Sequence, residues 1–224
     1  NTAVGYSAGV AVTTGIRNTL LGGTAGDALT EADKNVAVGY SALTADTLGS
    51  RSVAIGEAAL RAQNFTTATD TYNVAVGNSA GLSVTTGTVN TLIGGLSGDA
   101  LTTGNSNVAV GYATLSAGTG DAGVTAIGHN ALKSLNTNSA NYNTAVGESA
   151  GEAMTSGQQN TLIGGLAGDA LTDADFNTAV GVLALSGDTL GSRSTALGFY
   201  ALIAQNFTTA TDTYNVAVGH AAGA

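Results

Sequence analysis

The residues best suited to acid–base or metal chemistry are few and far apart in this chain. His129 and His220 are the only histidines, and cysteine is absent. Asp27, Asp99 and Asp169 recur in the motif Gly-Asp-Ala-Leu-Thr, whereas a calcium-binding β-roll requires glycine and aspartate at intervals of about nine residues. We therefore interpret these aspartates as turn residues, and we predict no metal site and no cofactor.

Groups that could support hydrolytic or covalent catalysis are also missing. Glu148 with Glu152, and Asp173 with Asp175, are isolated pairs of acids. No nucleophile–base pair, phosphate-binding loop or dinucleotide fingerprint occurs in the sequence. The chain is therefore predicted not to be an enzyme.

The composition indicates what kind of scaffold is available to position any site. The chain has 33 glycines and no proline, and 43% of its residues are hydrophobic although only 5% are aromatic. Small aliphatic side chains can fill a thin core but not a thick one. Charged residues make up only 9% of the chain, so the sequence is expected to fold rather than remain disordered.

Charge and hydropathy exclude two classes of partner. The net charge is −9, and the six basic residues are scattered along the sequence, so no basic stripe is expected to neutralise nucleic-acid phosphates. No apolar run approaches the length of about 18 residues that a transmembrane helix needs. We predict neither nucleic-acid binding nor membrane insertion by this segment.

An internal repeat organises the whole chain. The pentapeptide Asn-Thr-Ala-Val-Gly occurs thirteen times in related form, at intervals of 17, 17, 17 and 21, then 17, 17, 17 and 19, then 17, 17, 17 and 21 residues. These thirteen coils group in fours into superrepeats 1–72, 73–142 and 143–214, with a partial superrepeat at 215–224. We expect one repeat domain, residues 1–224, that is a fragment of a longer fibre.

The columns of the aligned coils predict an all-β parallel solenoid, or β-roll, because short coils rich in Thr, Val and Asn with a recurrent Gly disfavour helix. Column five is always Gly, which predicts a corner with positive φ or close backbone approach. Column one is mostly Asn, which predicts an Asn ladder between coils. Column eight, mostly Ala, predicts a second short strand or a turn.

Columns two and four are expected to fill the interior of the coil, because they share one strand face and column four is always aliphatic. On this interpretation Ile93→Asp would be severely destabilising. Column three, always Ala or Leu, would lie on the outer wall as an apolar strip that other copies cover. The predicted oligomer interface is Leu20, Leu92, Leu162, Ala37, Ala54 and Ala109.

Column six is the most variable column, which suggests exposure on the surface of a rigid repeat. We predict a binding surface formed by Tyr6, Tyr40, Tyr112, His129, Phe199 and His220. The alternative is that each Tyr only shields its corner Gly or the neighbouring coil.

The pentapeptides Ser52-Val-Ala-Ile-Gly56 and Asn73-Val-Ala-Val-Gly77 resemble the head repeats of YadA-like trimeric autotransporter adhesins, and similar runs resemble bacteriophage tail-fibre shafts. The resemblance covers all thirteen coils, although coils of 17 to 21 residues are longer than the head repeats. It implies a left-handed parallel β-roll, three rolls around a common axis, and an adhesive surface outside the cell.

Three hypotheses of function remain open from the sequence. The leading one is a non-enzymatic extracellular, cell-surface or virion fibre, homotrimeric or polymeric, that attaches to a cell-surface receptor or glycan. The second is a purely structural filament that assembles by stacking of coils. The third is an ice-binding β-solenoid, which needs regularly spaced threonine. The pairs Thr13-Thr14 and Thr85-Thr86 suggest it, but we expect their columns to be irregular in the neighbouring coils.

Overall fold

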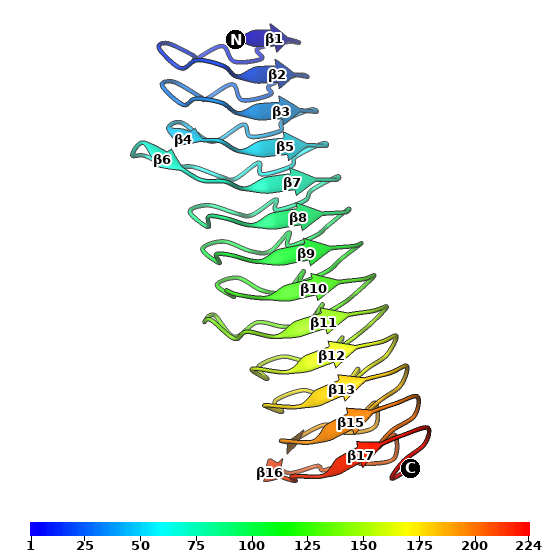
Figure 1. Ribbon diagram of the computed structural model, residues 1–224. Coiled ribbons are helices and arrows are strands. Elements are labelled where there is room, and N and C mark those ends of the chain that lie inside the picture. The colour runs from blue at the N-terminus through cyan, green and yellow to red at the C-terminus, as the bar shows by residue number, and fades with distance from the viewer.

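The computed structural model describes all of residues 1–224 and contains no helix. Thirteen three-residue strands, one from each coil, form a single parallel sheet in chain order (Figure 1). They are β1 (Thr2–Val4), β2 (Thr19–Leu21), β3 (Val36–Val38), β5 (Val53–Ile55), β7 (Val74–Val76), β8 (Thr91–Ile93), β9 (Val108–Val110), β10 (Thr125–Ile127), β11 (Thr144–Val146), β12 (Thr161–Ile163), β13 (Thr178–Val180), β15 (Thr195–Leu197) and β17 (Val216–Val218). The predicted all-β parallel solenoid is confirmed.

The strands pair in the register of the sequence columns. Ala3 faces Leu20 across the first pair of strands, and Val53 faces Val74 across the first 21-residue coil. The extra residues of the longer coils therefore lie outside the sheet. Two short pairs mark them: β4 (Gly49–Ser50) with β6 (Thr69–Asp70), and β14 (Gly191–Ser192) with β16 (Thr211–Asp212).

Most of the remainder of each coil is a series of turns rather than a second strand. Non-glycine residues adopt left-handed backbone conformations at the same columns in successive coils, for example Ser7 (φ 55°), Leu43 (φ 53°) and Arg51 (φ 65°). Such a conformation costs an L-residue roughly 1–2 kcal/mol. Hydrogen bonds from coil to coil, such as Gly9 N–H to Ala25 C=O at 3.0 Å, favour it in the stack.

The glycine of column five forms the corner that follows each strand. Gly5 has a φ of 135°, and a Cβ atom added there would clash with the carbonyl group of Gly22 in the next coil. Both predicted reasons for this glycine, positive φ and close backbone approach, are confirmed.

The interior of the coil is lined by column three, so the predicted interior of columns two and four is wrong. Leu20, Leu92, Leu162, Ala37, Ala54 and Ala109 are all 0% exposed within the single chain. They are core residues and cannot form the predicted oligomer interface. The physical reason is that the opposite wall fills the interior with its own side chains, so the sheet turns only Ala inward, or Leu where Gly stands opposite.

Large and small side chains alternate across this narrow interior. Leu20 enters it from the sheet, and the opposite wall makes room with Gly9 and Gly26, where an added Cβ would lie 2.6 and 2.8 Å from the Leu20 methyl groups. In the next two coils the sheet carries Ala, and Leu43 and Leu60 enter from the opposite wall. The repeat of four coils is therefore a packing pattern.

The asparagines of column one form the predicted ladder, and most of them are fully buried. The backbone N–H of Asn35 donates to Asn18 Oδ1 at 2.9 Å, and Asn35 Nδ2 donates to the carbonyl oxygen of Gly49 at 2.9 Å. Each side chain thus joins its neighbouring coil and closes a turn of its own coil.

The longer coils restore the ladder where column one lacks Asn. Ser52 carries no amide, and Gln63 from the same 21-residue coil takes that role: Asn73 Nδ2 donates to Gln63 Oε1 at 2.9 Å. Gln63 Nε2 in turn donates to Ser52 Oγ at 2.8 Å. Asn141 acts similarly beyond Val124, because it accepts a bond from the N–H of Asn143 at 3.3 Å.

Candidate interaction surfaces

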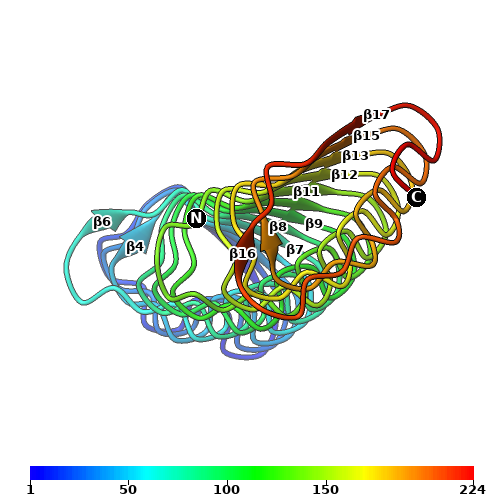
Figure 2. The same ribbon diagram turned by 90° about the horizontal axis from the view of Figure 1, so that it is seen from below.

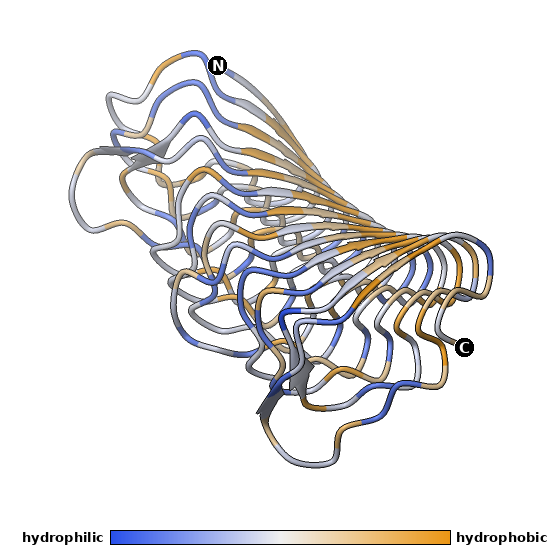
Figure 3. Cartoon of the chain, turned by 60° about the horizontal axis from the view of Figure 1, so that its bottom comes forward, coloured by the Kyte–Doolittle hydropathy of each residue, from blue (hydrophilic) through white to orange (hydrophobic).

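The outer face of the sheet carries columns two and four, which we call the outer strip. Column two is Thr in eight coils and Val in five, and column four is Val in seven, Ile in four and Leu in two. Ile93 is 38% exposed and Ile163 is 39% exposed. No charged residue interrupts the strip, and the strands of the sheet are coloured hydrophobic along the whole stack in Figure 3.

The strip is large for a surface exposed to water. At about 4.8 Å per coil the stack is on the order of 60 Å long, and a three-residue strand is roughly 10 Å wide. The strip therefore covers on the order of 600 Å² in one copy, which reaches the largest apolar patches that soluble monomers usually expose. It has the size and chemistry of an interface.

Column six lies just beyond the end of each strand, and we call this row the end-edge ladder. Its predicted exposure is confirmed: Tyr6, Tyr40, Tyr112 and Phe199 are among the exposed large side chains, and both histidines of this row are exposed too. The six residues do not converge on one site.

Neighbouring members of the end-edge ladder stack on each other. The rings of Tyr112 and His129 stack with centroids 5.8 Å apart, and those of Phe199 and His220 with centroids 5.4 Å apart. The Tyr40 ring lies 3.3 Å from where a Cβ of Gly23 would be, which agrees with the shielding interpretation. Any binding role of this row remains a prediction.

A second row, the residue immediately before column one, lies at the start of each strand, and we call it the start-edge ladder. The sequence reasoning missed it. All of its members have positive φ. They are Arg17, Lys34, Arg51, Tyr72, Val89, Ser106, Gly123, Tyr142, Gln159, Phe176, Arg193 and Tyr214.

Four of the six basic residues of the chain belong to this one row. All four are residue 17 of a 17-residue coil, whereas Tyr72, Tyr142 and Tyr214 of the same row end longer coils and fall in columns 21, 19 and 21. Counting backward from the next column one would have aligned the whole row. The basic residues that seemed scattered in the sequence are therefore concentrated on one edge of the sheet.

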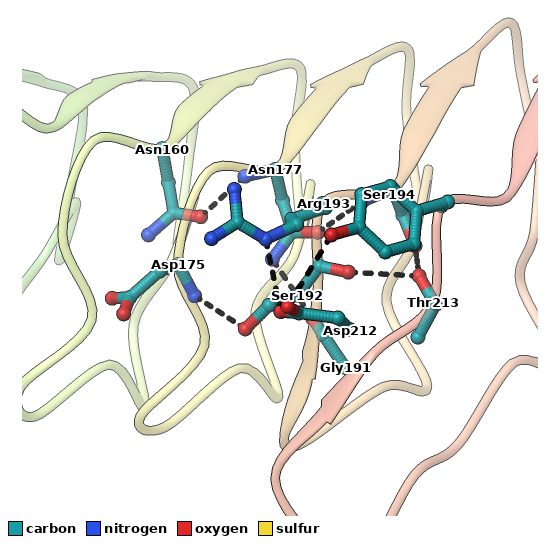
Figure 4. A network of polar contacts seen from close by, with 10 residues as sticks. Asn160, Asp175, Asn177, Gly191, Ser192, Arg193, Ser194, Asp212 and Thr213 are labelled. Carbon is teal, nitrogen blue, oxygen red and sulfur yellow. Dashed lines mark hydrogen bonds and ion pairs between the residues drawn. The ribbon is translucent and has the colours of Figure 1, made fainter.

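Arg193 shows how this edge is held in place (Figure 4). Its Nε lies 3.0 Å from Asp212 Oδ1, and its guanidinium group lies over the Phe176 and Tyr214 rings at 4.6 and 5.9 Å from their centroids. Arg193 thereby fastens the extra segment of the following 21-residue coil to its own coil and to the coil before it. Arg51 makes the equivalent ion pair with Asp70 at 2.8 Å, and this hydrogen-bonded carboxylate raises the pKa of Arg51.

The three recurring aspartates differ in their hydrogen bonding. Asp27 accepts a hydrogen bond from the Thr44 hydroxyl, whereas Asp99 Oδ1 and Asp169 Oδ1 are buried without a partner. Burial raises the pKa of Asp99 and of Asp169.

No group of three or more His, Asp or Glu residues is arranged to hold a metal ion, and no pocket is found. No helix is present that could span a membrane.

The threonines of column thirteen are regular, contrary to our expectation. Thr13, Thr30 and Thr47 occupy successive coils, as do Thr85, Thr102 and Thr119. Their hydroxyls donate to the next coil, for example Thr30 Oγ1 to Thr47 O at 3.1 Å and Thr102 Oγ1 to Thr119 O at 2.9 Å. The regularity thus serves hydrogen bonds between coils.

No protein-family model, curated protein or solved structure matches this chain. The fold and its surfaces define the class of protein: a parallel β-solenoid repeat protein with an apolar outer strip between two polar and aromatic edges.

Proposed function

We propose that this chain is a segment of a non-enzymatic, homo-oligomeric fibre that acts outside the cell or on a virion as a rigid rod supporting surface attachment. The observation that carries the proposal is the outer strip. The strip runs the length of the stack, it carries no charge, and other copies of the same chain would bury it. Two or three copies would together bury more than about 1,000 Å².

The architecture suits such a rod. Every coil is held to its neighbours by backbone hydrogen bonds, by the Asn ladder and by a continuous core. The resemblance to adhesin head repeats and tail-fibre shafts points to the same role, with three chains as the expected number. The interface proposed now is columns two and four, in place of column three.

The mass of the assembly tests the proposal. We expect light scattering to give a defined multiple of the chain mass, three being the expected number. Replacing Ile93 and Ile163 by Lys should dissociate the assembly without loss of β-content, because both side chains lie on the strip and outside the core. The control is lysine at Val10 and Leu82, which lie off the sheet. A monomeric wild-type segment would refute the proposal.

The same strip supports a second candidate, an ice-binding surface, because eight coils place Thr beside the aliphatic column four on an outward sheet face. The successive strands fan around the axis in Figure 2, so such a surface would match a flat lattice only over short stretches. Thermal hysteresis and ice-crystal shaping by a monomeric segment would favour this candidate over the oligomeric rod.

A further inference from the structure

Two ladders of opposite character border the outer strip. All strands of the sheet run parallel, so one border consists only of strand starts and the other only of strand ends. The start edge carries Arg17, Lys34, Arg51 and Arg193 and no acid, whereas the end edge carries Glu57 and Glu148 and no Lys or Arg. The border residues of both kinds are largely exposed.

The geometry of the strip brings these borders together when copies assemble. The strip is roughly 10 Å wide, and sheets that pack face to face lie about 10 Å apart. Copies that bury so narrow a face must also touch at its borders. If the copies are related by rotation about an axis along the rod, their strands all run in the same sense around that axis. The start edge of each copy then meets the end edge of the next.

We propose that each start-edge residue contacts, in a second copy of this chain, the end-edge residue that flanks the same strand. This inference rests on the proposed homo-oligomeric rod and adds its register and its side-chain contacts. The partner of the column-six aromatic residues is then a second copy and not a receptor.

The charged residues agree with this register. Arg51 and Glu57 flank β5. At the level of this strand, the cation of one copy would therefore meet the carboxylate of the next copy. Lys34 flanks β3 with Tyr40, and a cation over an aromatic ring is an attractive contact.

Residue size is complementary at several strands, whereas both borders are bulky at others, such as β15 with Arg193 and Phe199. Gly123 and His129 flank β10, and Val89 and Gly95 flank β8, so a bulky residue meets a small one. None of the strands has residues of like charge at its two borders. A shift of register would lose the match between Arg51 and Glu57.

Engineered cysteines can test these contacts directly because the chain has none of its own. Ser106 and Tyr112 flank β9, and the strand between them keeps them more than about 10 Å apart within one chain, too far for a disulfide. In the variant Ser106→Cys with Tyr112→Cys, oxidation or a short bis-maleimide should give covalent oligomers on a denaturing gel. The control, Ser106→Cys with Phe199→Cys, places the two thiols five strands apart in the sheet, at about 24 Å, and should give none.

Each outcome is decisive. A monomer by light scattering would refute the homo-oligomeric rod itself. An intact oligomer without cross-links in the matched pair would leave the rod standing and overturn the edge contacts, and so would cross-links in the control pair alone. If the wild-type oligomer binds a glycan or receptor through Tyr40 and Tyr112, the assignment of column six to contacts between copies is wrong.

A charge reversal gives an independent measurement. Glu57→Lys should weaken assembly by up to about fivefold for each junction, because it faces Arg51. The matched control is Glu148→Lys, since Glu148 has the same position in its coil and flanks β11 opposite the uncharged Tyr142. Equal effects of the two variants on the assembly constant, measured by sedimentation, would contradict the register.

Discussion

At the scale of single residues, the decisive feature is which face of each three-residue strand turns inward. Column three faces a wall so close that Ala fits in most coils, and Leu fits only where Gly stands opposite it. Columns two and four are bulkier and point outward. The core is consequently built from Ala and from Leu placed opposite Gly, and the Val and Ile residues of the sheet lie on its outer face.

Two neighbouring residues of β8 should therefore respond oppositely to the same change. Leu92→Asp places a carboxylate in the apolar interior, where an unpaired charge costs several kcal/mol, and we expect loss of β-structure by circular dichroism. Ile93→Asp, which we had expected to be severely destabilising, should retain its β-content, because Ile93 is on the outer strip. Loss of structure in both variants would show that the strip is also needed for folding.

At the scale of elements, the longer coils have a structural role that their sequence does not reveal. They coincide with the three coils in which column one is Ser52, Val124 or Ser194. In each case the longer coil supplies a substitute amide, Gln63, Asn141 or Gln205, to the next Asn. An Asn ladder with gaps would leave buried polar groups unpaired, and the additional residues prevent this.

Removal of one such amide should be costly. Gln63 is fully buried and also donates to Asp46 Oδ2 at 2.6 Å, so Gln63→Ala would leave polar groups of Asp46 and Asn73 unpaired. Each unpaired buried group costs about 1–3 kcal/mol, and we expect a loss of stability of about 3 kcal/mol in denaturant unfolding. Thr67→Ala, an exposed change in the same segment, is the control. Equal midpoints for the two variants would show that the amide is dispensable.

At the scale of the whole molecule, the stack is a one-dimensional array in which each coil contacts only its neighbours. The superrepeats present equivalent surfaces to one another: Leu60 and Leu132 lie at corresponding positions against Gly81 and Gly151 of the following coils. Four coils form a packing unit that begins and ends in the same register. The molecule is accordingly modular along its axis.

Excision of residues 73–142 should therefore produce a shorter but intact rod. The deletion joins Tyr72 to Asn143, which has the role of Asn73 in the ladder. We expect unchanged β-content per residue and a rod shorter by roughly 19 Å in small-angle scattering. Deletion of residues 73–139, which breaks the column register, is the control and should unfold the junction. If the first variant unfolds too, the superrepeats are not interchangeable.

The sequence alone determined the parts of this protein that repeat along the chain. The recurrent pentapeptide located every strand of the main sheet, column five predicted the corner glycines, column one predicted the Asn ladder, and the variability of column six predicted its exposure. Each of these follows from one column, because stacked coils place equivalent residues next to each other.

Only the tertiary structure decided which face of the strand is inside and which residues share an edge. Strand alternation separates two faces but does not orient them, and here both faces are apolar. The orientation depends on the opposite wall of the coil, where Gly9 and Gly26 leave room for Leu20. Likewise Tyr72 and Tyr214 join Arg51 and Arg193 in one ladder only because the longer coils loop out of the stack, so a row in space need not keep a constant spacing in the sequence.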